Sequence, residues 1–104
     1  TVRGYLREMG HAVVEAATAA EAEMLARMPE VTHVITDLDL GDGPDGYEFA
    51  NKLRTHNKTI PILVITGLSP NDHLHKRVLE DFVVLQKPFT FSALAARMQR
   101  LSVS

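Results

Sequence analysis

The sequence predicts an α/β fold in which helices cover both faces of a parallel β-sheet. Three short apolar runs rich in β-branched residues support this prediction, at residues 34–37, 62–66 and 82–88. Runs of this kind are typical of strands that are buried on both faces of a parallel sheet. Helical patterns lie between the runs, and right-handed crossovers place such helices on the two faces. We therefore expect a doubly wound parallel sheet.

The first third of the chain predicts two helices and a fourth strand between them. Residues 3–9 have the pattern of the last turns of a helix, and the glycine that follows is typical of a helix end. Residues 12–16 are predicted to form a short strand. Thr18 followed by Glu21 is a capping-box pattern, so a second helix is expected to begin here and to end near Met28.

Three further helices are predicted from helix caps and apolar periodicity. Asp45 and Glu48 mark the start of one helix, and a polar, weakly amphipathic helix is expected from about residue 70 to 79. Thr90 caps a last helix whose apolar residues recur with a 3.6-residue period. The core residues expected from the first and last of these helices are Phe49, Ala50, Leu53, Phe91, Leu94, Ala95, Met98 and Leu101.

Composition limits the class of protein. A chain of 104 residues can build one hydrophobic core but not two, so residues 1–104 are predicted to form a single domain. The net charge is -2 and no stretch concentrates Lys and Arg, which argues against direct nucleic-acid binding. No apolar run approaches the roughly 20 residues that span a bilayer, and no signal-peptide pattern opens the chain. We therefore expect a cytoplasmic protein without membrane contact.

A polar side chain ends or follows each of the three apolar runs. Asp37 ends the first run, Thr66 ends the second, and Lys87 follows the third strand. Ligands of open parallel sheets bind outside the carboxyl ends of the strands, so these side chains are expected to meet at one edge. The acid can accept a phosphoryl group or hold a metal, while the hydroxyl and the ammonium group contact phosphoryl oxygens. The sequence therefore predicts a phosphoryl site at this edge.

The same residues carry a resemblance to a known family. Four motifs occur in order, with 29 residues from Asp37 to Thr66 and 21 from Thr66 to Lys87. The motifs are Asp37 at a strand end, Asp45-Gly46, Thr66-Gly67 and Lys87-Pro88-Phe89. From Arg3 to Leu101 the chain resembles the receiver domain of bacterial two-component response regulators, which has a flavodoxin-like, CheY-like doubly wound sheet.

The resemblance implies a signalling phosphoacceptor rather than an enzyme. Asp37 would take a phosphoryl group from a histidine kinase or a phosphotransfer protein, while Thr66 and Lys87 contact the phosphoryl oxygens. Family members use Mg²⁺, for which Asp37 would supply one ligand and the backbone carbonyl of Asp39 another. Gly67 would leave the site unobstructed, and the bond between Lys87 and the following proline is expected to be cis.

Two departures from the family pattern bear on this function. The family's first strand is central in its sheet order 2-1-3-4-5 and is followed by an acidic pair, and residues 1–104 contain neither. The receiver domain is therefore expected to be incomplete at its N-terminus, with weak affinity for Mg²⁺. At the switch position of the last strand, which is often aromatic in the family and is coupled to Thr66, this chain has Val84.

The resemblance also implies where partner proteins bind. The usual partner surface comprises the last two helices and the strand between them, here about Pro70 to Leu101, and homodimers are expected through this surface. An incomplete sheet leaves strand edges open, so strand exchange between two copies is a second route to a dimer.

Two other functions fit parts of the pattern. The main alternative is a degenerate receiver that is not phosphorylated and acts as a protein-docking module, which the missing acidic pair and Val84 favour. Asp37-Leu38-Asp39 also resembles the nucleophile motif of haloacid-dehalogenase-type phosphatases. That family has Thr or Val where this chain has Gly41, and it needs a late acidic pair, whereas no acidic residue follows Asp81 here.

Two patterns of metal-ligating residues are weak. Asp37, Asp39 and Glu48 match positions 1, 3 and 12 of an EF-hand loop, but the glycine that this motif requires is absent. His73 and His75 lie two residues apart on a predicted helix, where their side chains face apart. We therefore expect both histidines to be surface residues.

Overall fold

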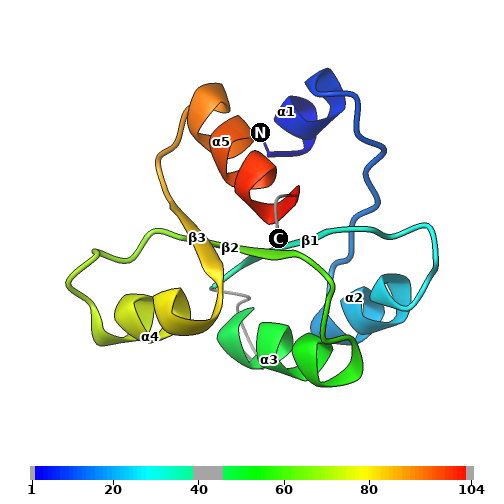
Figure 1. Cartoon of the computed structure of the whole chain (residues 1–104), viewed down its shortest axis with the longest axis horizontal. Helices are drawn as coiled ribbons and strands as arrows, with labels where there is room; N and C mark the ends of the chain where they lie inside the picture. The colour runs from blue at the N-terminus through cyan, green and yellow to red at the C-terminus, as the bar shows by residue number, and fades with distance from the viewer. Residues whose placement is uncertain (1, 39–45, 103–104) are drawn as a thin grey trace.

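The computed structural model describes residues 2–38 and 46–102, and these residues form an alternating series of helices and strands (Figure 1). The elements in chain order are α1 (Val2–Glu8), α2 (Ala19–Ala26), β1 (Val34–Asp37), α3 (Gly46–His56), β2 (Ile62–Thr66), α4 (His73–Asp81), β3 (Val83–Gln86) and α5 (Phe91–Ser102). No helix in this part of the chain is long and apolar enough to cross a membrane.

The three strands form one parallel sheet in the order β1-β2-β3. Their register aligns Thr36 with Val64 and Val64 with Val84. The hydrogen-bond ladder continues past the strand ends, because Leu38 N–H donates to the Ile65 carbonyl at 2.7 Å and Lys87 N–H donates to the Thr66 carbonyl at 2.7 Å. The carboxyl ends of the three strands therefore lie together at one edge of the sheet.

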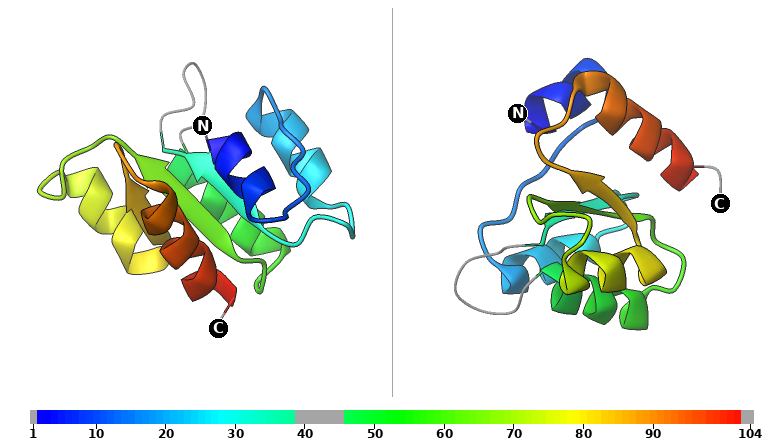
Figure 2. Two further views of the ribbon diagram at one scale, coloured as in Figure 1. Left: turned by 90° about the horizontal axis from the view of Figure 1, so that it is seen from above. Right: turned by 90° about the vertical axis from the view of Figure 1, so that its left-hand side faces the viewer.

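Helices cover both faces of this sheet, which confirms the predicted doubly wound α/β architecture. Helices α1 and α5 lie on one face, and α2, α3 and α4 lie on the other (Figures 1 and 2). Successive strand residues point to opposite faces, so β2 sends Ile62 and Val64 to one core and Leu63 and Ile65 to the other. All five residues of β2 are buried. A strand covered on both faces needs the continuous apolar run that the sequence shows.

Most predicted helix boundaries are confirmed by their caps. Gly10 follows α1 with a φ of 93°, a backbone conformation that glycine adopts without steric cost. Thr18 Oγ1 accepts a hydrogen bond from the Glu21 N–H at 3.1 Å, and Thr90 Oγ1 caps α5 in the same way. The start of α4 was predicted too early, at about residue 70. The helix begins at His73 because the Asp72 carboxylate caps it, accepting from the Leu74 N–H at 2.8 Å.

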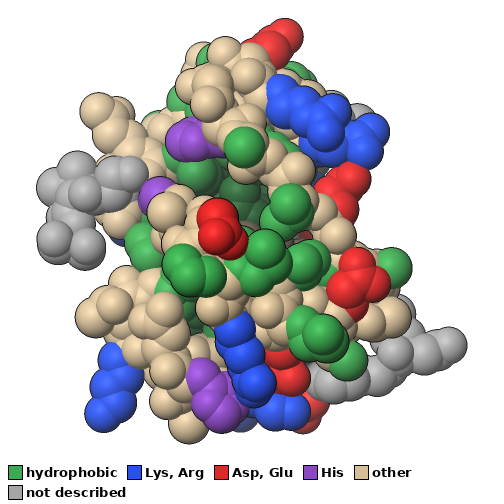
Figure 3. Space-filling model, turned by 90° about the vertical axis from the view of Figure 1, so that its right-hand side faces the viewer, with side chains coloured by type: hydrophobic (Ala, Val, Ile, Leu, Met, Phe, Trp, Pro, Cys, Tyr) green, Lys and Arg blue, Asp and Glu red, His purple; other side chains and the backbone are tan. Residues whose placement is uncertain are grey.

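The predicted strand at residues 12–16 is wrong, because this segment has no regular secondary structure. A strand is held by hydrogen bonds to a neighbouring strand, and within the described residues β1 pairs only with β2. Residues 12–16 and β1 instead line the same cavity of about 980 Å³. Figure 3 shows this side of the molecule, where hydrophobic side chains gather around a hollow. Among the described residues, no strand forms backbone hydrogen bonds with this segment, which lies across the cavity from β1.

Candidate functional site

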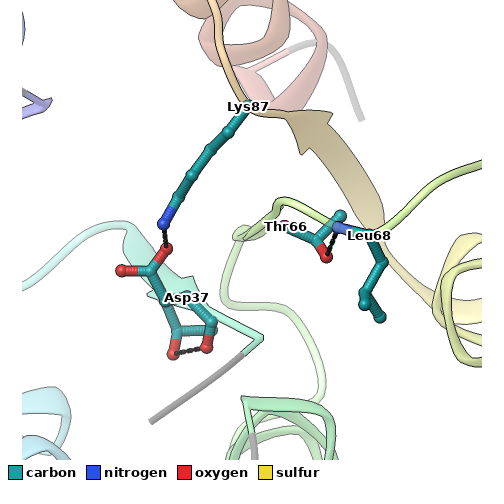
Figure 4. A network of polar contacts seen from close by, with 5 residues as sticks. Asp37, Thr66, Leu68 and Lys87 are labelled. Atoms are coloured by element: carbon teal, nitrogen blue, oxygen red, sulfur yellow. Dashed lines mark hydrogen bonds and ion pairs between the residues drawn. The ribbon is translucent and has the colours of Figure 1, made fainter.

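An ion pair joins two of the predicted site residues at the carboxyl edge of the sheet. Lys87 Nζ lies 2.8 Å from Asp37 Oδ1, and Figure 4 shows the lysine side chain extending from the end of β3 to the carboxylate at the end of β1. The Lys87 and Asp37 side chains are 49% and 47% exposed. A small anionic group can therefore approach both from solvent. The peptide bond between Lys87 and Pro88 is cis, as predicted.

The backbone at the start of α3 packs closely against the backbone of Asp37. A Cβ atom added to Gly46 would collide with the carbonyl oxygen of Asp37, so only glycine fits where α3 begins. Gly46 N–H also donates to the Leu38 carbonyl at 2.7 Å, and the Thr36 hydroxyl donates to the Asp37 carbonyl at 3.1 Å. These contacts explain why a glycine is needed at position 46, where α3 begins behind Asp37.

Thr66 lies next to this pair in the sheet but directs its hydroxyl elsewhere. The register pairs Asp37 with Ile65, so Thr66 follows the partner of Asp37 directly. Thr66 is only 3% exposed, and its Oγ1 accepts a hydrogen bond from the Leu68 N–H at 3.0 Å (Figure 4). The structure thus brings Asp37 and Lys87 into contact and places Thr66 beside them with its hydroxyl bound to the following loop. A Cβ atom on Gly67 would meet nothing within 4 Å.

His75 is a residue that the sequence reasoning misjudged. It was expected on the surface with His73, but it is 5% exposed and its Nδ1 lies 3.1 Å from the Leu68 carbonyl oxygen. Gln86 Nε2 donates to the same carbonyl at 3.0 Å. His75 and Val78 are the buried residues of α4, and their spacing of three puts them on one helix face. The three-residue spacing from the apolar Val78 would have predicted that His75 is buried. The spacing between the two histidines alone does not predict this.

The switch position holds an apolar side chain inside the core. Val84 is 6% exposed and packs in the cluster formed with α3 and α4. Its backbone carbonyl accepts a hydrogen bond from Arg97 Nε on α5 at 3.0 Å. Val84 carries neither a ring nor a hydroxyl, so a coupling to Thr66 needs other side chains.

The residues that the structure describes do not make a complete magnesium site. Mg²⁺ prefers near-octahedral oxygen coordination, and Asp37 offers one carboxylate, which already pairs with Lys87. No group of three or more His, Cys, Asp or Glu in residues 2–38 and 46–102 is arranged to hold a metal ion. The other predicted ligand, the carbonyl of Asp39, lies outside the described residues, as do the predicted cap Asp45 and the loop before it.

Two histidines lie close together at the cavity beside β1, which Asp37 also lines. The rings of His11 and His33 have centroids 6.5 Å apart, and both residues line the 980 Å³ cavity. Burial lowers the pKa of His33 below its ordinary value, and the positive charge that His11 can carry lowers it further. The folded surroundings of His33 therefore disfavour its charged form.

Comparison with known proteins decides the family. The model of the response regulator receiver domain matches residues 1–99. The chain belongs to this family. Receivers are generally signalling modules of two-component systems, and response regulators work with histidine kinases or phosphotransfer proteins.

Similar proteins place the receiver among known response regulators. The two-component response regulator PhoP of Pseudomonas aeruginosa is 38% identical over 100 residues, which are 92% of this chain and 43% of that protein. The transcriptional regulatory protein CusR of Escherichia coli K12 is 33% identical over 99 residues, 92% of this chain and 42% of that protein. The chain thus spans less than half the length of these relatives. A response regulator receiver protein from Sinorhizobium medicae is 27% identical with a TM-score of 0.79, covering 96% of this chain and 81% of that one.

Proposed function

We propose that this receiver domain accepts a phosphoryl group on Asp37 from a phosphohistidine of a histidine kinase or phosphotransfer protein. The observation that supports this most directly is the 2.8 Å contact between Lys87 Nζ and Asp37 Oδ1 at the carboxyl edge of the sheet. A carboxylate nucleophile with an ammonium group beside it suits phosphoryl transfer, because the reaction depends on positioning and on neutralising oxygen charge.

The proposed transfer forms one bond and breaks another. An Asp37 carboxylate oxygen attacks phosphorus and forms the O–P bond of an acyl phosphate. The P–N bond to the donor imidazole breaks in line with the attack, and its electron pair leaves with the imidazole nitrogen. Lys87 then exchanges its contact with the carboxylate for one with a phosphoryl oxygen, which remains within reach of its long side chain. Thr66 donates its hydroxyl hydrogen to another phosphoryl oxygen.

Mass spectrometry with a small phosphoryl donor tests the proposal. The purified protein is incubated with acetyl phosphate, with and without Mg²⁺, and its intact mass is measured beside an Asp37→Asn control. We expect one phosphoryl adduct in the native protein and none in the control. Equal labelling of the Asp37→Asn variant, or no labelling of the folded native protein under either condition, would contradict the proposal.

The role of Lys87 is tested in the same assay. Lys87→Ala removes the ammonium group that neutralises the transferring oxygens and is expected to slow labelling by a factor on the order of 10². Because Lys87 is half-exposed, the variant is expected to fold, which thermal unfolding checks. A labelling rate within twofold of the native protein would remove Lys87 from the proposed site.

A protein-docking module without phosphorylation is the second candidate function, and Val84 is the observation that favours it. The buried valine cannot act as the aromatic switch of the family. Leu79 on α4 is 52% exposed, and Phe91 on α5 is 37% exposed with its ring packed edge-on against Tyr5 of α1. We propose the surface formed by α4, β3 and α5 as a partner or homodimer face. Sedimentation of the native protein and of Leu79→Glu tests it, and a monomer in both, with and without acetyl phosphate, would contradict the homodimer.

A further inference from the structure

The backbone of Leu68 connects three elements of the structure. Its N–H donates to Thr66 Oγ1 at the end of β2 at 3.0 Å. Its carbonyl oxygen lies 3.1 Å from His75 Nδ1 on α4 and accepts from Gln86 Nε2 on β3 at 3.0 Å. Both backbone polar groups of Leu68 are therefore bound by side chains from neighbouring elements.

The contact with Leu68 shows which ring nitrogen of His75 carries a hydrogen. A carbonyl oxygen can only accept a hydrogen bond, so His75 Nδ1 must carry the hydrogen. His75 is 5% exposed and lies beside the buried Val78, where few water molecules can replace a lost partner. Hydrogen bonds in such surroundings are strong, and an unpaired polar group there is costly. The contact therefore holds the loop after β2 in one position.

The contact with Leu68 also orients the Thr66 hydroxyl. A threonine hydroxyl has one hydrogen to donate and two lone pairs that accept. Since the Leu68 N–H uses one lone pair, the direction of the remaining hydrogen depends on where Leu68 lies. In the proposed reaction this hydrogen binds a phosphoryl oxygen on Asp37.

We infer that His75 and Gln86 are positioning residues for the phosphoryl site, acting on Thr66 through the carbonyl of Leu68. This inference rests on the proposed function. Because coupling between two sites is reciprocal, a movement of Thr66 toward a phosphoryl group also shifts Leu68 and changes its bonds to α4 and β3. The two side chains thus provide the coupling between Thr66 and α4 that Val84 cannot.

The sheet register supports the participation of Gln86. Gln86 is the direct partner of Thr66 across β2 and β3, so its amide reaches the Leu68 carbonyl from the strand next to Thr66. Lys87 follows Gln86 and donates its own N–H to the Thr66 carbonyl at 2.7 Å. A movement of Leu68 therefore also moves the backbone that carries Lys87, as well as α4.

Nuclear magnetic resonance on the unphosphorylated protein tests the coupling alone. The imidazole nitrogens of ¹⁵N-histidine protein are compared between the native chain and Thr66→Val, which removes the acceptor of the Leu68 N–H but keeps the side-chain shape. We expect the native His75 to be held as the Nδ1–H tautomer, and Thr66→Val to change its nitrogen shifts. The exposed His73 on the same helix is the control and stays unchanged. Identical His75 signals in both proteins would overturn the inference.

Substitutions at His75 test its effect on the reaction. The amide nitrogen of asparagine is as many bonds from Cα as Nδ1, whereas that of glutamine corresponds to Nε2. His75→Asn is therefore expected to keep the rate of Asp37 labelling by acetyl phosphate, while His75→Gln lowers it several-fold. His73→Gln is the matched control with no effect. Equal rates in His75→Asn and His75→Gln would contradict a role for the Nδ1 donor.

A variant outside α4 keeps the inference testable if His75→Gln fails to fold. Gln86→Met removes the second donor to Leu68 with little change in volume, and is expected to slow labelling and to shift the His75 nitrogen signals. Native behaviour in both measurements would overturn the inference. If the native protein takes no phosphoryl group, the proposed function fails, and the comparison of His75 signals in Thr66→Val still decides whether the coupling exists.

Discussion

Two segments of the chain differ in how deeply their strands and helices are buried. We call residues 46–102 the closed half, in which β2 has a hydrogen-bonded strand on each side and every residue buried. We call residues 10–37 the open half. Within the described residues β1 pairs with one strand, as β3 does in the closed half, but Val34 and Ile35 are only half-buried and α2 has no buried residue. The comparison shows that an apolar run forms a strand here only where a second strand supplies hydrogen bonds.

The proposed site spans the boundary between these halves. Asp37 comes from the open half, while Thr66 and Lys87 come from the closed half, as do His75 and Gln86. Gly46 connects the two by its close approach to the Asp37 carbonyl. The closed half is therefore expected to hold the groups that orient the reaction, and the open half to contribute the acceptor.

Hydrogen exchange is expected to show the largest difference between the halves. Amides of residues 12–16 have no strand partner and exchange through openings that cost little free energy, whereas amides of β2 exchange only on global unfolding. The two groups are expected to differ by roughly 5 kcal/mol in opening free energy. Exchange followed by mass spectrometry checks this, and comparable protection of both segments would remove the distinction.

Core substitutions are expected to follow the same division. Leu94 is fully buried against β2 and β3, so Leu94→Ala is expected to cost about 2–5 kcal/mol of unfolding free energy. Met24 on α2 is 71% exposed, and Met24→Ala is expected to change stability by less than about 0.5 kcal/mol. Urea unfolding measures both. Similar losses for the two variants would mean that the open half contributes to the core after all.

Two glycines at the site test whether the close contact between the two halves matters for stability. Gly46→Ala forces a Cβ atom against the Asp37 carbonyl and is expected to cost about 1–3 kcal/mol. Gly67→Ala adds its methyl group to open space and is expected to leave stability nearly unchanged. Thermal unfolding of the two variants is a matched test, since the chemical change is the same. Equal losses would show that the Gly46 contact is not the constraint.

The smallest expected effect is a pH dependence from the open half. The pKa of His33 is lowered in the folded protein, mainly by burial and also by His11, so the unfolded chain binds a proton first as the pH falls. Titration of His33 therefore costs no stability above about pH 7. Below that, the free energy of unfolding declines as the pH drops through about 6.5 toward the lowered pKa. His33→Gln is expected to flatten this decline, measured by urea unfolding between pH 5.5 and 7.5. An unchanged slope would assign the decline to other groups.

The sequence predicted the closed half well because its signals are local. Apolar runs, the Thr90 cap and the 3.6-residue period of α5 depend only on neighbouring residues, and the structure agrees with them except at Phe91, which was predicted in the core but is 37% exposed. The segment at residues 12–16 was predicted wrongly because its conformation depends on whether a partner strand lies beside it. No local pattern carries that information.

The sequence predicted that Asp37 and Lys87 lie together, but not the contacts that support them. Asp37 and Lys87 were placed together correctly because parallel strands align their carboxyl ends at one edge. His75 was misplaced because its burial results from the packing of α4 over β3 and the hydrogen bond to Leu68, a contact across seven residues of loop and helix. That contact is a tertiary one, which histidine spacing on a single helix cannot predict.

Mapping the phosphorylated residue tests the central proposal most directly. The protein is labelled with acetyl phosphate, the acyl phosphate is reduced with borohydride to homoserine, and the tryptic peptide of residues 28–52 is sequenced by mass spectrometry. We predict homoserine at position 37 alone. Homoserine at Asp39, Asp42 or Asp45, or an unmodified peptide from a protein that carries the phosphoryl adduct, would contradict Asp37 as the acceptor.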